Sequence, residues 1–70
     1  MDKLHYKGWD IIPTALPTSD HKWTASCDLA RVNADGEQVF EGATMQFVRD
    51  MKEDAIAAAC DEAVIQIDNI

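Results

Sequence analysis

The segment from Lys22 to Val32 most constrains the fold, because its apolar and polar residues alternate along its length. A period of two places successive side chains on opposite faces of a strand, so the segment predicts a half-buried β-strand. Residues 33–36 read Asn-Ala-Asp-Gly, and the Asp-Gly pair supplies the positive φ that a tight hairpin requires. A further strand is therefore expected to return antiparallel from Glu37. One face would carry Trp23, Ala25, Cys27 and Leu29, and the other Thr24, Ser26, Asp28 and Ala30.

Two more strand segments flank this central strand in the sequence. Leu4–Ile12 is rich in aromatic and β-branched residues and is followed by Pro13, so it is predicted as one first strand. Gly8 within it would permit a bulge or a close approach. Residues 14–20 contain turn-forming residues and are predicted as a connecting loop. In this strand Trp9 and Ile11 would share one face, and Tyr6, Asp10 and Ile12 the other.

The strand that begins at Glu37 continues its apolar pattern past Gly42 to Val48. One bent strand with a bulge at Gly42 and two short strands fit this pattern equally well.

The C-terminal third of the chain predicts one amphipathic helix, from about Met51 to Asp68. Asp50 is expected as its N-cap, with Glu53 completing a capping-box pair three residues later. The helix is expected to carry one apolar stripe, whose small residues would let it lie close to the sheet. Trp9 and Trp23 would fill the core from the sheet side. The expected stripe consists of Ala55, Ile56, Ala59, Cys60, Ala63 and Ile67, with Val64 at its edge. The predicted fold is therefore a single α+β domain over residues 1–70: a three-stranded antiparallel sheet (β-β-β) packed by one C-terminal α-helix.

The net charge of −7 is unevenly distributed along the 70 residues. Residues 1–32 carry four acids and four bases, whereas residues 33–70 carry nine acids and two bases. Because phosphate backbones and anionic lipids are bound through Lys and Arg, this acidic half disfavours nucleic acid and membrane surfaces as partners. It favours solubility or a basic partner. No apolar stretch approaches the roughly 20 residues of a membrane span, and the N-terminus lacks a secretory apolar region, so a cytoplasmic location is expected.

The residues that could perform chemistry are isolated from one another. His5, His21, Cys27 and Cys60 show no metal-ligand spacing, and the two cysteines lie in apolar patterns typical of buried free thiols. Whether these two thiols are close enough to pair is left open by the sequence. A chain of this size also has a thin core, which disfavours a deep substrate pocket. We therefore expect no enzyme activity, no cofactor and no metal.

Two candidate partner surfaces remain. A second helical stripe outside the main apolar face would carry Met51, Ala58 and Ile65, together with the acids Asp54, Asp61 and Glu62. It predicts either ordinary exposed surface or a contact with a protein partner or a second copy; an exposed strand edge is the other route to such a contact. A weaker basic and aromatic set, His5, Lys7 and Lys22 near Tyr6, Trp9 and Trp23, predicts nucleic-acid binding as the alternative function.

Several motifs carry a family resemblance. They are Tyr6-Lys7-Gly8-Trp9-Asp10-Ile11, then Pro13, Trp23-Thr24-Ala25, a glycine turn and the helix EDAIAAACDEAVIQID. This series resembles a group of small uncharacterised bacterial proteins with a β-β-β-α domain. The resemblance implies the fold and carries over no catalytic residue.

The same order of strands and helix is similar to antitoxins that bind a toxin through a partial double-stranded-RNA-binding fold, but the Phe-Pro-Asp-Leu-type segment is absent here. It is also similar to small three-strand DNA-binding domains, whose basic sheet face is lacking. The predicted function is a non-enzymatic protein-interaction domain; the alternatives are a nucleic-acid-binding or antitoxin-like protein.

Overall fold

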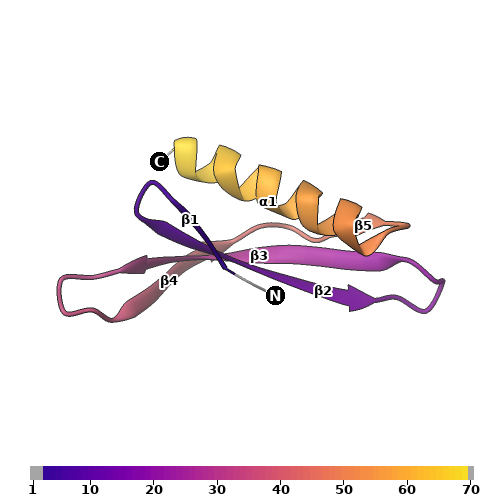
Figure 1. Cartoon of the computed structure of the whole chain (residues 1–70), viewed down its shortest axis with the longest axis horizontal. Helices are drawn as coiled ribbons and strands as arrows, with labels where there is room; N and C mark the ends of the chain where they lie inside the picture. Colours follow the sequence, from indigo (N-terminus) through magenta and orange to yellow (C-terminus); the bar gives the residue numbers. More distant parts are fainter. Residues whose placement is uncertain (1–2, 70) are drawn as a thin grey trace.

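A computed structural model describes residues 3–69 and shows an α+β fold in which one helix covers one face of an antiparallel sheet (Figure 1). The sheet has five strands rather than the three predicted. In chain order the elements are β1 (Leu4–Tyr6), β2 (Trp9–Pro17), β3 (Trp23–Val32), β4 (Gln38–Ala43), β5 (Phe47–Arg49) and α1 (Lys52–Asp68).

The central element of the sheet is β3, which was predicted from its alternating pattern. It pairs with β2 along one side and with β4 and then β5 along the other, while β1 extends the sheet beyond β2. The predicted turn that follows β3 is confirmed: Asn33 N–H donates to the Glu37 carbonyl at 2.9 Å, and Gly36 has a φ of 83°.

The prediction of a single first strand over residues 4–12 is wrong, because the chain reverses at Lys7 and Gly8. Both residues have positive φ, 50° and 82°, and the two-residue turn pairs Tyr6 with Trp9 and His5 with Asp10. Positive φ at both central positions defines the type I′ turn that matches the twist of a hairpin. Gly8 is thus a turn residue rather than a bulge, and Tyr6 shares the face of Trp9 instead of the face of Asp10.

The predicted loop over residues 14–20 is also wrong in its first half, since β2 continues to Pro17 and pairs with β3 throughout. Pro13 lies opposite Cys27, whose N–H and carbonyl both bond to Thr44 on the far side of β3. The backbone of Pro13 therefore faces away from β3 and lies beyond the described pairs of β1 and β2. Proline is tolerated at this position, because no N–H is needed there for a hydrogen bond to β3.

For the segment from Glu37 to Val48 the sequence left open one strand bulged at Gly42 or two short strands; the structure has two strands, β4 and β5, and the bulge lies at Glu41 rather than at Gly42. The register moves from Leu29 opposite Gly42 to Ala30 opposite Phe40, so Glu41 is an extra, bulged residue. The strand then breaks after Ala43, and Thr44 bridges the gap. Its hydroxyl oxygen accepts the Cys27 N–H at 2.9 Å and its own N–H donates to the Cys27 carbonyl at 2.8 Å, so the interruption leaves no β3 backbone group unbonded there.

The helix begins one residue later than predicted, and the expected Asp50 cap is wrong. Met51 is the N-cap, its carbonyl accepts the Ala55 N–H at 3.1 Å, and no side chain caps the first turn. The Asp50 carboxylate instead lies 3.9 Å from the Lys22 ammonium. Glu53 and Asp54 do occupy the first turn, where the helix dipole favours negative charge.

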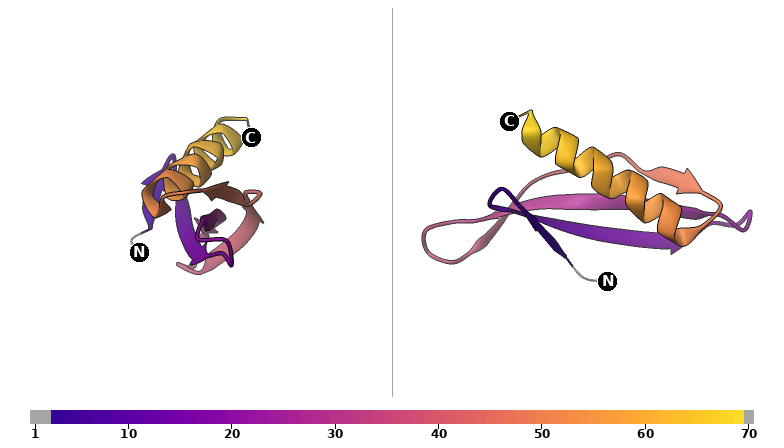
Figure 2. Two further views of the ribbon diagram at one scale, coloured as in Figure 1. Left: turned by 90° about the vertical axis from the view of Figure 1, so that its right-hand side faces the viewer. Right: turned by 45° about the horizontal axis from the view of Figure 1, so that its top comes forward.

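The core lies between α1 and the β2–β3 part of the sheet, which Figure 2 shows from two further sides. The predicted alanine stripe is confirmed. Trp9 is buried, with 6% of its surface exposed, and the Arg31 guanidinium lies 4.2 Å from its ring centroid. Trp23, expected in the core, is only half-buried at its margin, where the Lys52 ammonium lies 5.3 Å from the ring. The buried core residues are Trp9, Ile11, Ala25, Cys27, Leu29, Ala55, Ala59, Ala63 and Ile67.

Candidate functional site

The structure places the predicted helical stripe on the solvent side of α1. Met51 and Ile65 are 58% and 53% exposed at its two ends, and Ala58 between them is half-buried. Positions three and four apart share a helix face, so these residues and the predicted acids form one surface. Within residues 3–69 none of these acids forms an ion pair. The stripe is therefore an acidic surface with an apolar residue at each end, made of Met51, Asp54, Ala58, Asp61, Glu62 and Ile65.

The predicted basic set is not brought together. Lys7 lies in the β1–β2 turn and Lys22 directly precedes β3, at the opposite ends of β2. Each of the three also faces a carboxylate: His5 contacts Asp10, Lys7 contacts Asp68, and Lys22 lies near Asp50. No shared cationic surface results from His5, Lys7 and Lys22 in the described part of the chain.

Lys7 instead ties the first hairpin to the end of the helix. Its ammonium lies 2.7 Å from the Asp68 carboxylate, and the Tyr6 hydroxyl donates to the same group at 3.0 and 3.2 Å. A carboxylate in the last turn is unfavourable to the helix dipole, and these donors offset that cost. The hydrogen bonds from Lys7 and Tyr6 lower the pKa of Asp68, and the Asp68 contact raises the pKa of Lys7.

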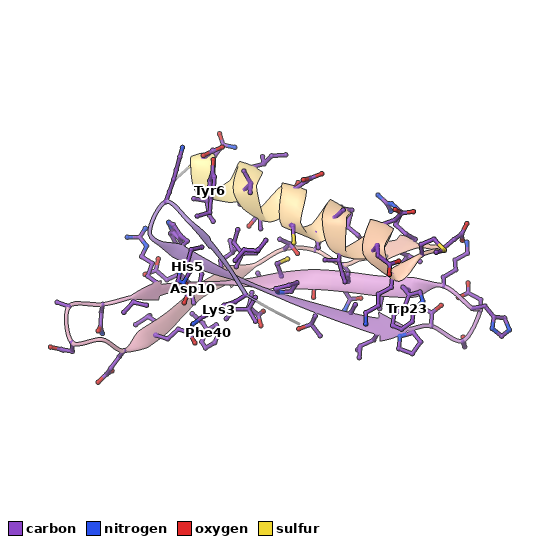
Figure 3. All side chains as sticks on the ribbon, viewed as in Figure 1. Lys3, His5, Tyr6, Asp10, Trp23 and Phe40 are labelled. Atoms are coloured by element: carbon purple, nitrogen blue, oxygen red, sulfur yellow. The ribbon has the colours of Figure 1, made fainter. Side chains whose placement is uncertain are left out.

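Asp10 forms a buried polar cluster on the sheet face that lacks the helix (Figure 3). Its side chain is 2% exposed; one carboxylate oxygen lies 2.6 Å from His5 Nδ1, and the other lies 3.0 Å from Gln38 Nε2 and 3.5 Å from Lys3 Nζ. Buried carboxylates are stabilised by such donors, so the cluster fixes β1 and β4 to β2. The imidazole of His5 remains exposed.

The sequence interpretation missed this cluster because it treated residues 4–12 as one strand. In an extended strand His5 and Asp10 lie far apart, whereas the two-residue turn at Lys7 and Gly8 makes them directly opposed neighbours. The signal that could have found it is the pattern of two short apolar segments separated by Lys-Gly.

The outer strand β4 is the most exposed element of the sheet. All six of its residues are exposed, and no described strand pairs with its outer edge. Phe40 is 61% exposed and Val39 40%. The β3–β4 hairpin extends past the C-terminal end of α1, so the helix does not cover its tip (Figure 1). An aromatic side chain thus stands on a strand edge with free hydrogen-bonding groups.

The described residues contain no pocket and no group of three or more potential metal ligands. The two cysteines are free and lie together, with 3.9 Å between their Sγ atoms. His5 and Asp10 resemble the base and orienting acid of a hydrolytic triad, but no hydroxyl or thiol among residues 3–69 bonds to the imidazole.

Comparisons with known protein families, with curated proteins and with solved structures found no match. Within residues 3–69 the one helix is too short and too polar to cross a membrane.

Proposed function

We propose that this protein is a non-enzymatic protein-interaction domain that binds an extended, basic segment of a partner protein by strand addition to the outer edge of β4. The observation that carries the proposal is the exposed edge of β4, which pairs with no described strand beyond β3 and bears the exposed side chain of Phe40. Strand addition uses the free backbone groups of such an edge for affinity and neighbouring side chains for specificity.

The register of the hairpin indicates which backbone groups of β4 are free. Asn33 and Glu37 form the hydrogen-bonded pair that closes the turn, and such pairs alternate along an antiparallel ladder. Val39 therefore bonds to Arg31, while the N–H and carbonyl groups of Gln38 and Phe40 point outward. These groups match the spacing at which an added strand forms its bonds.

Many exposed strand edges carry features that prevent pairing with another chain, and β4 has few of them. Lysine and proline are absent from its sequence, QVFEGA, and the bulge at Glu41 affects only its second half. Phe40 is an aromatic side chain of the kind enriched in interface hot spots. The first half of β4 is therefore the accessible part of the edge.

The charge near this edge selects a basic occupant. Asp35 and Glu37 form no ion pair with any described residue, and Glu41 is paired with Arg31 at 3.3 Å. A second copy of the chain would itself carry a net charge of −7. Like charges across an interface are costly, so a basic segment is favoured over self-association.

The proposal is tested by titrating the isotope-labelled protein with a ten-residue peptide of alternating lysine and valine and recording amide NMR shifts. The amide signals of Gln38 and Phe40 should shift most, and a peptide with glutamate in place of lysine should give no shift. The matched variants Phe40→Ser and Ile65→Ser each replace an exposed apolar side chain by a small uncharged one, on β4 and on α1. Only Phe40→Ser should abolish the shifts.

Three results would overturn this assignment. Shifts confined to α1 and abolished by Ile65→Ser would move the binding surface to the helical stripe. Shifts that appear without peptide as the protein concentration rises, together with a dimeric mass in light scattering, would identify a second copy as the occupant. No shift with either peptide at millimolar concentration would reject strand addition of basic segments.

A further inference from the structure

The two cysteines of the chain face each other across the layer between sheet and helix. Cys27 lies in the middle of β3, Cys60 in the middle of α1, and their Sγ atoms are 3.9 Å apart although the residues are 33 positions apart in sequence. Ordinary packing brings other pairs of apolar side chains this close. Here both contacting atoms are thiol sulfurs, which can be joined covalently.

The alanine stripe accounts for this proximity. Ala55, Ala59 and Ala63 are fully buried, so α1 lies close to the strands beneath it. Short side chains on both surfaces can then meet, and a cysteine on each side spans the remaining gap. A disulfide has an S–S length of about 2.0 Å, so closure requires the two sulfurs to approach by roughly 1.9 Å.

The two thiols differ in access to solvent. Cys27 is fully buried, whereas Cys60 lies at the margin of the core and is half-buried. Burial, followed by the neighbouring Cys60 thiol, raises the pKa of Cys27 to about 12. Because the thiolate is the attacking species, Cys60 is the group that an external reagent meets first, and Cys27 reacts only with a sulfur that is already beside it.

We propose that Cys27 and Cys60 form an oxidisable dithiol site that takes small disulfide oxidants of the glutathione disulfide class and closes to an intramolecular disulfide between β3 and α1. This inference concerns the interior of the domain and does not rest on the proposed binding at β4.

The reaction proceeds by two exchanges. The Cys60 thiolate attacks one sulfur of the oxidant, so that a mixed disulfide forms and one reduced thiolate leaves. The Cys27 thiolate then attacks the Cys60 sulfur, the bond to the reagent breaks, and a second reduced thiolate leaves. The two thiol protons are transferred to the two leaving thiolates. Both cysteines are thereby oxidised to one disulfide, and the oxidant is reduced to two thiols.

The experiment equilibrates the full chain with glutathione disulfide and glutathione at pH 8, quenches with acid and measures masses. The folded protein should become two hydrogens lighter, without a stable glutathione adduct. Cys27→Ala should stop at one glutathione attached to Cys60. Cys60→Ala should remain unmodified until urea is added, because Cys27 is inaccessible to the reagent while the protein is folded.

The decisive quantity is the effective concentration of the two thiols, obtained from the same equilibrium with and without unfolding urea. Flexible chains give values in the millimolar range, and a pair held in contact should exceed the unfolded value at least about tenfold. Equal values in the two states, or a folded protein that retains the mixed disulfide, would overturn the proposal. Circular dichroism of both alanine variants confirms that they are folded before the comparison.

Discussion

Replacing each tryptophan by alanine tests the arrangement of the core, because the structure assigns the two residues different burial. Trp9 is 6% exposed beneath the helix and Arg31, whereas Trp23 is half-buried at the core margin. Trp9→Ala should therefore cost clearly more free energy of unfolding than Trp23→Ala, although the two residues have the same size.

The expected loss of unfolding free energy follows from the area that each tryptophan buries. A buried tryptophan hides up to about 250 Å², worth about 6 kcal/mol at about 25 cal/mol/Å². Measured truncations of buried Trp cluster at about 3–5 kcal/mol, since the alanine and partial relaxation recover some of the loss. We expect about 4–5 kcal/mol for Trp9→Ala and about 2 kcal/mol for Trp23→Ala. A 70-residue domain has about 4–10 kcal/mol in total, so Trp9→Ala should remove about half of the stability or more.

Urea unfolding followed by circular dichroism measures both costs on the same scale, and stabilising osmolytes can refold Trp9→Ala if needed. The variant Trp9→Phe serves as a control that keeps an aromatic ring in the core. If Trp23→Ala costs as much as Trp9→Ala or more, the helix does not cover the sheet as described here.

Three further substitutions test local features. Met51→Ser supplies the missing N-cap oxygen and should raise stability by about 1 kcal/mol, visible as a higher Tm, whereas an unchanged Tm would contradict the helix start. Asp10→Asn keeps the shape of the buried side chain but weakens its contacts with His5 and Lys3, and should cost about 1–3 kcal/mol in urea unfolding; a neutral result would contradict the buried cluster. Asp68 has a lowered pKa, so its stabilising effect is present above the ordinary aspartate value near pH 4 and is lost as the pH falls through the folded value. The Tm deficit of Asp68→Asn should accordingly be largest near neutral pH and vanish in acid, and a deficit that persists in acid would show that the carboxylate charge is irrelevant.

The sequence predicted those parts of the fold that depend on local periodicity. The alternation over residues 22–32 and the helical spacing from Ala55 to Ile67 each report which face is buried, and both were confirmed. The Asp-Gly turn was confirmed for the same reason, because positive φ is a local requirement. Helix and central strand were therefore predictable from their own residues.

The errors arose where a residue's role depends on its neighbours in space. Lys7 adopts positive φ without the Asn or Asp that usually marks such a turn, so the first hairpin was missed. Pro13 ends a strand only if its nitrogen faces a partner strand that needs its N–H, and here it faces away from β3. The position of Asp10 and the contact between Cys27 and Cys60 follow from these pairings and from the helix–sheet distance, which no single segment encodes.

The position of β3 determines how the domain loses its structure. This strand touches β2, β4, β5 and the helix directly, and only β1 reaches the rest of the molecule mainly through β2. An opening motion that exposes the middle of β3 must separate two strands and the helix at once, which amounts to global unfolding. Amide hydrogens around Cys27 should therefore exchange with solvent last, and those of β1 should exchange earlier, through local fraying.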